Sequence, residues 1–180
     1  MDKLDDAILL EQITYLDQTS VLSQNQMMCL ADLLHKNLTK DDAKYFRKMT
    51  ENQINSIPSA ILTLFPMDEI LMIPHEGCPA LISRLGKADS TLLPKSSPMR
   101  VIFQTKAMSC LDMTKPEVVK LGFLVCDISA SKLSGIPNEQ FKTLMPKLHA
   151  CGTLSNEKAT IVKRKLKTSF GYVIQMDNWL

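Results

Sequence analysis

Residues 121–171 decide the fold class, and they read LGFLVCDISASKLSGIPNEQFKTLMPKLHACGTLSNEKATIVKRKLKTSFG. Polar turns divide this stretch into short segments, and the apolar residues within each segment recur at helical spacing. In the last segment the apolar residues are Ala159, Val162, Leu166 and Phe170. The pattern predicts three short amphipathic helices, each with one apolar face.

Helix-start signals recur through the rest of the chain. Capping-box patterns, in which a Ser or Thr caps a helix and a Gln or Glu three residues later reaches back, begin at Ser23, Thr50 and Thr114. A further cap signal covers residues 39–42, and we expect the helix before it to end near residues 36–37. Closely spaced starts favour short helices joined by tight turns.

Two segments of the chain form a degenerate internal repeat. INSIPSAILTLFP begins at Ile54 and LSGIPNEQFKTLMP begins 79 residues later, at Leu133. Each segment places an aliphatic residue three positions before an Ile-Pro pair, and a second proline follows at Pro66 or Pro146. We expect both of these prolines to stop or kink their helices. Stacked helical repeats are the physical interpretation of such a pattern.

The composition is that of an ordinary globular protein. Apolar residues make up 45% and charged residues 22% of the 180 positions, and the net charge is +2. A charge this small gives no sequence-wide electrostatic attraction to nucleic acid. The apolar runs are shorter than the roughly 18 residues that a membrane-spanning helix requires. The N-terminal sequence MDKLDDAILLEQ is acidic, unlike a signal peptide.

Catalytic and metal-binding patterns are not found in the sequence. His35, His75 and His149 are widely separated, and none belongs to an HExxH motif. A zinc site built from His149, Cys126 and Cys151 lacks the usual CxxC or paired-histidine spacing. The glycines form no phosphate-binding loop. We therefore expect no enzymatic activity, no cofactor and no metal site.

A cluster of basic residues marks a possible contact surface on the last predicted helix. The cluster comprises Lys158, Lys163, Arg164, Lys165 and Lys167. These cations could face phosphates or an acidic partner. The regular apolar stripe on the other side favours a solvated outer face instead.

The cysteines and one sequon bear on the cellular compartment. The chain has an odd number of cysteines, five: Cys29, Cys78, Cys110, Cys126 and Cys151. In the cytosol they would be free thiols, whereas in a secreted protein four would pair and one would be left over. Asn37-Leu38-Thr39 is a glycosylation sequon, which we expect at an exposed turn, with the glycan on Asn37 if the chain is secreted.

Three pieces of the opening stretch resemble a known family. LGFLVCDIS, LSGIPNEQFKTLMPKLHAC and LSNEKATIVKRKLKTSFG contain, in order, a Leu-Gly-x-Leu-x-Cys helix, an Ile-Pro turn, a second cysteine and a helix ending in Phe-Gly. This order resembles the repeat of the stereocilin, otoancorin and mesothelin family, with the otoancorin branch nearest. The resemblance extends to IPSAILTLFP and GCPALISRLGK and covers roughly residues 20–180.

The resemblance implies an all-α fold, a superhelical stack of short helices like an armadillo or HEAT solenoid. We expect residues 1–180 to be one helical-repeat region with approximate sub-units 1–53, 54–113 and 114–171. The sequence shows none of the family's signal peptide, N-terminal repeats or C-terminal anchor signal, so we expect it to be a fragment of a longer array or a truncated member.

The same resemblance assigns the cysteines to pairs. It implies disulfides between Cys126 and Cys151 and between Cys78 and Cys110, each joining consecutive helices. Cys29 would then pair with an upstream cysteine that this chain does not contain.

Family members are non-enzymatic glycoproteins of the cell surface or extracellular space. They attach cells to one another, or attach the apical surface of an epithelium to an extracellular matrix such as the acellular gels of the inner ear. The resemblance therefore implies a cell-adhesion protein whose partner is a protein or glycoprotein of the matrix or of an opposing cell. The missing signal peptide and the basic last helix support an alternative, an intracellular α-solenoid scaffold that binds a peptide or an acidic protein.

Overall fold

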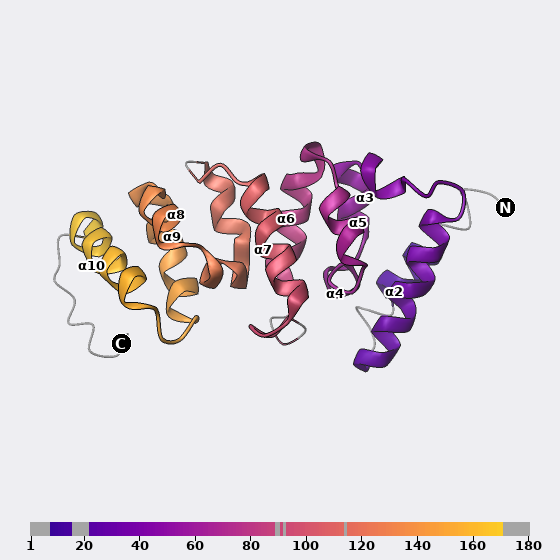
Figure 1. Ribbon diagram of the computed structural model, residues 1–180, viewed down its shortest axis with the longest axis horizontal. Coiled ribbons are helices and arrows are strands. Elements are labelled where there is room, and N and C mark those ends of the chain that lie inside the picture. Colours follow the sequence, from indigo (N-terminus) through magenta and orange to yellow (C-terminus); the bar gives the residue numbers. More distant parts are fainter. Residues whose placement is uncertain (1–7, 16–21, 89–90, 92, 114, 171–180) are drawn as a thin grey trace. The chain divides into compact units, whose positions relative to one another are not determined.

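The protein is all-α in the part of the chain that the structure describes. This computed structural model describes residues 8–15, 22–88, 91, 93–113 and 115–170. Within these ranges every regular element is an α-helix or a 3₁₀-helix, and no strand occurs (Figure 1). The predicted helical class is confirmed. The chain divides into two compact units, residues 1–110 and 111–180, and the predicted sub-unit boundary at residue 53 lies within a helix of the first.

The first unit consists of short helices. They are the helical segment 8–15, α2 (Gln24–Thr39), η1 (Tyr45–Lys48), α3 (Glu51–Ser56), α4 (Ser59–Leu62), α5 (Met67–Met72), η2 (His75–Gly77), α6 (Cys78–Lys87) and α7 (Pro98–Cys110). Helix α6 packs against α3, α4 and α7, while α5 packs against η1 and α7. These contacts make α6 the centre of the unit.

An aromatic cluster fills one part of this unit's core. The rings of Phe46 and Phe65 are fully buried and meet edge to face, with centroids 5.4 Å apart. The His35 ring lies 5.6 Å from Phe46 and 6.3 Å from Phe65. Because these rings come from α2, η1 and the turn before α5, the cluster joins three parts of the unit.

Two of the predicted capping boxes are confirmed. Ser23 caps α2 and Thr50 caps α3, and each is paired with a glutamine three residues later. The cap signal predicted from residue 39 is wrong, because Thr39 is the last residue of α2 and its hydroxyl donates to the His35 carbonyl oxygen. Thr114 lies outside the described residues, and the helix after it takes Lys115 as its N-cap.

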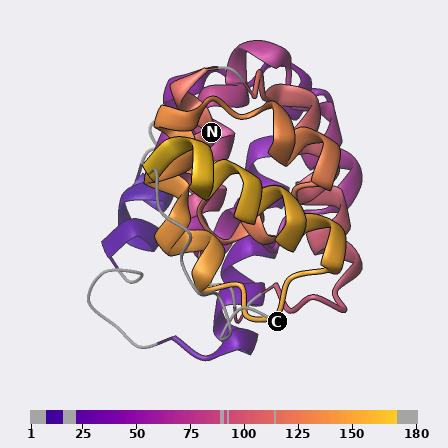
Figure 2. The same cartoon turned by 90° about the vertical axis from the view of Figure 1, so that its left-hand side faces the viewer.

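The second unit has a similar construction from fewer helices. They are η3 (Pro116–Asp127), α8 (Ala130–Gly135), α9 (Asn138–His149) and α10 (Asn156–Phe170). Helix α9 packs against η3, and α10 packs against both α8 and α9, which Figure 2 shows as a yellow helix crossing the orange ones. The element η3 bends at Gly122, where φ is 56° and only glycine is comfortable.

The two predicted helix-breaking prolines behave differently. Pro66 is the N-cap of α5 and separates it from α4, as expected. Pro146 lies inside α9, which continues to His149, so the predicted stop is wrong there. Pro146 is exposed on this helix, and water can therefore reach the backbone that lacks an amide donor.

The Ile-Pro repeat corresponds to a repeated local structure. Helices α3, α5 and α8 are each six residues long, and each ends at a buried isoleucine followed by proline: Ile57, Ile73 and Ile136. In all three the isoleucine N–H donates to the carbonyl three residues before it. The repeat predicted at two positions therefore occurs at three, and α5 is the copy that the sequence pattern missed.

Candidate interaction surface and disulfide-linked helices

Two disulfides join neighbouring helices, one in each unit. Cys78 at the start of α6 is bonded to Cys110 at the end of α7, with a Cα–Cα distance of 5.4 Å. Cys126 in η3 is bonded to Cys151 just after α9, with a Cα–Cα distance of 5.3 Å. These are the two pairs that the family resemblance implies. Bridges over such loops stabilise a chain by about 3–4 kcal/mol each in the chain-entropy model.

The surroundings of the two bridges differ in their electrostatics. Cys78 is buried at the N-terminus of α6, and its Sγ lies 3.7 Å from the Nδ1 atom of His75. Cys151 follows the C-terminus of α9, and its Sγ lies 3.2 Å from the carbonyl oxygen of Lys147. A helix N-terminus and a neighbouring imidazole stabilise a thiolate, whereas carbonyl oxygens at a C-terminus do not.

The fifth cysteine is placed on a helix surface. Cys29 is exposed on α2 and forms no disulfide within the chain. Its neighbours Met28 and Leu33 are also exposed, at 51% and 49%. The upstream partner that the resemblance implies for Cys29 is not part of this sequence, so the pairing stays a prediction.

The glycosylation sequon is placed differently from the prediction. Asn37 lies in the last turn of α2, where it is half-buried, and its carbonyl accepts the Lys40 N–H. Thr39, the sequon's third residue, uses its hydroxyl on the His35 carbonyl. The expected exposed turn is therefore wrong, because α2 continues through the sequon.

The predicted basic cluster on α10 is divided between the interior and the surface. Lys165 is buried, and its Nζ donates to the Ile136 carbonyl oxygen, 2.5 Å away. Desolvation, helped by the neighbouring charge of Arg164, lowers the pKa of Lys165. Lys158 is half-buried and donates to the Cys126 carbonyl oxygen at 2.9 Å. These two lysines therefore hold α10 against α8 and η3.

The other three members of the cluster lie on the surface. Lys163, Arg164 and Lys167 are exposed on the opposite side of α10 from its buried residues Val162 and Leu166. They occupy positions i, i+1 and i+4 of one helix, so they form a short continuous stripe. We call these three residues the α10 stripe.

The first unit contains a counterpart of Lys165 that the sequence analysis missed. The Nζ atom of Lys106 on α7 donates to the carbonyl oxygens of Ile73 and Leu71 at the end of α5. Burial lowers the pKa of Lys106 as it does for Lys165. Each unit thus has a lysine from a later helix that caps the carbonyl end of a six-residue helix. A lysine beside apolar residues on the inner helix face was the available signal.

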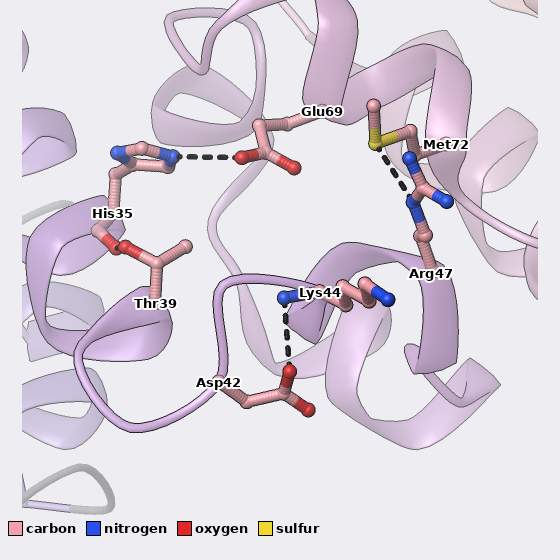
Figure 3. A network of polar contacts seen from close by, with 7 residues as sticks. All are labelled: His35, Thr39, Asp42, Lys44, Arg47, Glu69 and Met72. Atoms are coloured by element: carbon pink, nitrogen blue, oxygen red, sulfur yellow. Dashed lines mark hydrogen bonds and ion pairs between the residues drawn. The ribbon is translucent and has the colours of Figure 1, made fainter.

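A polar network at the edge of the aromatic cluster has a structural arrangement (Figure 3). His35 Nε2 and Glu69 Oε1 lie 3.4 Å apart and connect α2 to α5. The Thr39 hydroxyl bonds to the backbone of His35 and not to its ring, so the ring does not activate it as a nucleophile. Asp42 accepts hydrogen bonds from the Lys44 N–H and the Lys48 ammonium, which holds the pKa of this carboxyl below its usual value.

Possible metal ligands are dispersed through the structure. In the part of the chain described above, no group of three or more His, Cys, Asp or Glu side chains could hold a metal ion. His149 is exposed and Cys126 and Cys151 are bonded to each other, so these residues form no ligand set. Among the described helices, none is long and apolar enough to span a bilayer.

The chain was compared with protein-family models, curated proteins and solved structures, and no match was found in any of them.

Proposed function

We propose that this chain is a non-catalytic adhesion module of the cell surface or extracellular space, related to the stereocilin, otoancorin and mesothelin family. In this proposal its short helices stack into a superhelix and present a surface to the extracellular matrix or to an opposing cell. The partner is a matrix or cell-surface component.

The disulfide pattern is the observation that supports this proposal most directly. Both units carry one bridge between consecutive helices, and the four bonded cysteines leave only the exposed Cys29. Bridges of this kind form and persist in oxidising compartments and are rare in cytosolic proteins. The repeated six-residue helices ending in Ile-Pro agree with the repeat organisation of the family.

The decisive experiment is non-reducing peptide mapping of the protein from its natural source. The proposal expects peptides linked through Cys78–Cys110 and Cys126–Cys151, together with a glycan on Asn37. Five free thiols in a cytosolic protein would overturn it and would favour the intracellular scaffold instead. Occupied Asn37 would exclude that scaffold, because N-glycans are added in the secretory route.

Small-angle X-ray scattering tests the superhelical stack separately. A compact domain of this length has a radius of gyration of about 16 Å. A stack of helices is elongated, so the intact chain should give a value clearly above that figure. A monomer that measures about 16 Å would contradict the solenoid and leave the adhesive function to be judged from the disulfides.

A further inference from the structure

We propose that the α10 stripe, formed by Lys163, Arg164 and Lys167, binds a sulfated polysaccharide. This inference rests on the proposed extracellular function, and it names the chemical class of the matrix partner. Its three steps are the availability of the cations, the lack of a compensating charge within the fold, and the absence of an apolar anchor around them.

The stripe is free to meet a ligand because the inward lysines have taken over the structural contacts. Lys158 and Lys165 bind backbone carbonyls of η3 and α8, and they fix how α10 rotates about its own axis. Lys163, Arg164 and Lys167 then project from the exposed side. One helical turn rises about 5.4 Å, so the three charges lie along a short line that a linear polyanion can follow.

The fold supplies no negative charge beside these cations. The positions one turn away are neutral, since four residues before Lys163 and Arg164 stand Ala159 and Thr160. Lys163 and Lys167 are themselves four residues apart, and like charges at this spacing repel one another. An external anion would relieve this repulsion, whereas a stripe selected only for solubility would normally interleave both signs.

The charge of the chain is also distributed unevenly. Residues 111–180 contain ten Lys and Arg against six Asp and Glu, a net charge of +4. Residues 1–110 contain eleven Lys and Arg against thirteen Asp and Glu, a net charge of −2. The second unit is therefore the one that attracts a polyanion, although the whole chain is nearly neutral.

The surroundings of the stripe favour a polysaccharide over an acidic protein. Protein interfaces are usually centred on apolar or aromatic anchors with a polar rim. The exposed large hydrophobic side chains among the described residues all belong to the first unit: Ile8, Tyr15, Met28, Leu33, Met67, Leu71, Met72 and Val101. A sulfated polysaccharide needs no such anchor, because ammonium and guanidinium groups bind its sulfates directly, as they bind phosphates.

The test is salt-dependent binding of the full chain, with its disulfides intact, to immobilised heparin. The stripe variant is Lys163→Gln with Arg164→Gln and Lys167→Gln. The control variant is Lys36→Gln with Lys44→Gln and Lys87→Gln, which removes the same number of exposed charges from the first unit. By the logic of counterion release, loss of three contacts should lower the slope of log affinity against log salt by about two to three units.

The expected result is that the stripe variant elutes at lower salt while the control elutes with the parent protein. An equal loss in both variants would show attraction by net charge alone and would overturn the proposal. Retention that is no better on heparin than on its desulfated form would overturn it as well. If the triple variant does not fold, Lys163→Gln and Lys167→Gln made singly should each lower the slope by about one unit.

Two further arms separate the possible partners and the two proposals. Polyglutamate at equal charge should compete poorly with heparin, and equal competition would assign the stripe to an acidic peptide instead. Free thiols in a cytosolic native protein would overturn the extracellular function whatever the heparin result. Loss of stripe-specific retention, with the disulfides and the glycan confirmed, would overturn only the polysaccharide.

Discussion

The Nε atom of Arg47 donates a hydrogen bond to the Sδ atom of Met72, 3.3 Å away, across the same 25-residue separation that the Cys126–Cys151 disulfide spans. The two pairs also lie 79 residues apart, which is the spacing between the two Ile-Pro sequences recognised in the chain. The first unit therefore has a weak contact where the second has a covalent bond (Figure 3). The two units are variants of one pattern that differ in how their helices are joined.

This difference predicts unequal costs of removing the two connections. Replacing Cys126 and Cys151 together by alanine should lower the free energy of unfolding by about 3–4 kcal/mol. Met72→Ala should cost about 1 kcal/mol or less, because this side chain is 37% exposed and its partner is a surface arginine. Urea denaturation followed by circular dichroism measures both values. Similar losses for the two changes would contradict the equivalence in strength that we assign to them.

A second prediction concerns the close approach of η2 to α3. A Cβ atom on Gly77 would lie 2.5 Å from the Cδ1 atom of Ile54 and 3.0 Å from the Cγ2 atom of Ile73. Both isoleucines are fully buried and have little room to move, so Gly77→Ala should destabilise the protein by about 1–3 kcal/mol. Thermal unfolding measures the effect.

The matched control for that change is Gly135→Ala at the end of α8. Nothing lies within 4 Å of a Cβ built there, and alanine is the better helix former. We expect a stability equal to that of the parent or up to about 1 kcal/mol higher. If both substitutions cost the same, steric exclusion at Gly77 is not the reason.

The sequence predicted the local features of this fold well because their causes are local. Ser23 and Thr50 each have their glutamine partner within one turn, so the capping box can be read without knowing the tertiary structure. Thr39 failed the same reasoning, because a hydroxyl in the last helical turn can bond backward to its own helix. The choice depends on how far α2 continues.

The inward lysines could not be predicted from periodicity because their partners are distant in sequence. Lys165 bonds to a carbonyl 29 residues earlier, and Lys106 to one 33 residues earlier. A hydropathy pattern assigns lysine to the solvent side, and it contains no information on which helix ends need a donor. The same limit explains why the predicted basic surface contained all five cations of α10 while the structure exposes only Lys163, Arg164 and Lys167.

A third prediction concerns the alkaline pH range and the buried Lys165. Its pKa is lower in the folded protein than the ordinary value of 10.5, so the unfolded chain binds more protons between the two values. Stability linked to this residue therefore rises with pH as the pH approaches 10.5, and is lowest where the ammonium is fully charged. The difference in unfolding free energy between the parent and Lys165→Met should grow in favour of the parent over this range.

That comparison is best made in a Cys29→Ser background, because an exposed thiol exchanges with disulfides at high pH. Lys163→Met removes a charge from the exposed side of α10 and serves as the control for charge loss. A difference between the parent and Lys165→Met that stays constant with pH would mean that burial does not perturb this ammonium.

The last prediction is that the two disulfides open in a fixed order under a thiol reductant. Attack by the reductant thiolate on the half-buried Cys110 sulfur forms a mixed disulfide and releases the Cys78 thiolate. That leaving group is stabilised by the α6 N-terminus and by His75, 3.7 Å away, and a second thiol then completes the reduction. Cleavage at the other bridge releases a thiolate with no such stabilisation when Cys151 leaves, because that sulfur faces a carbonyl oxygen. Timed reduction with alkylation and peptide mapping should therefore detect modified Cys78 and Cys110 first, and His75→Ala should reduce the lead. Earlier modification of Cys126 and Cys151 would show that access to the sulfurs, and not thiolate stabilisation, controls the order.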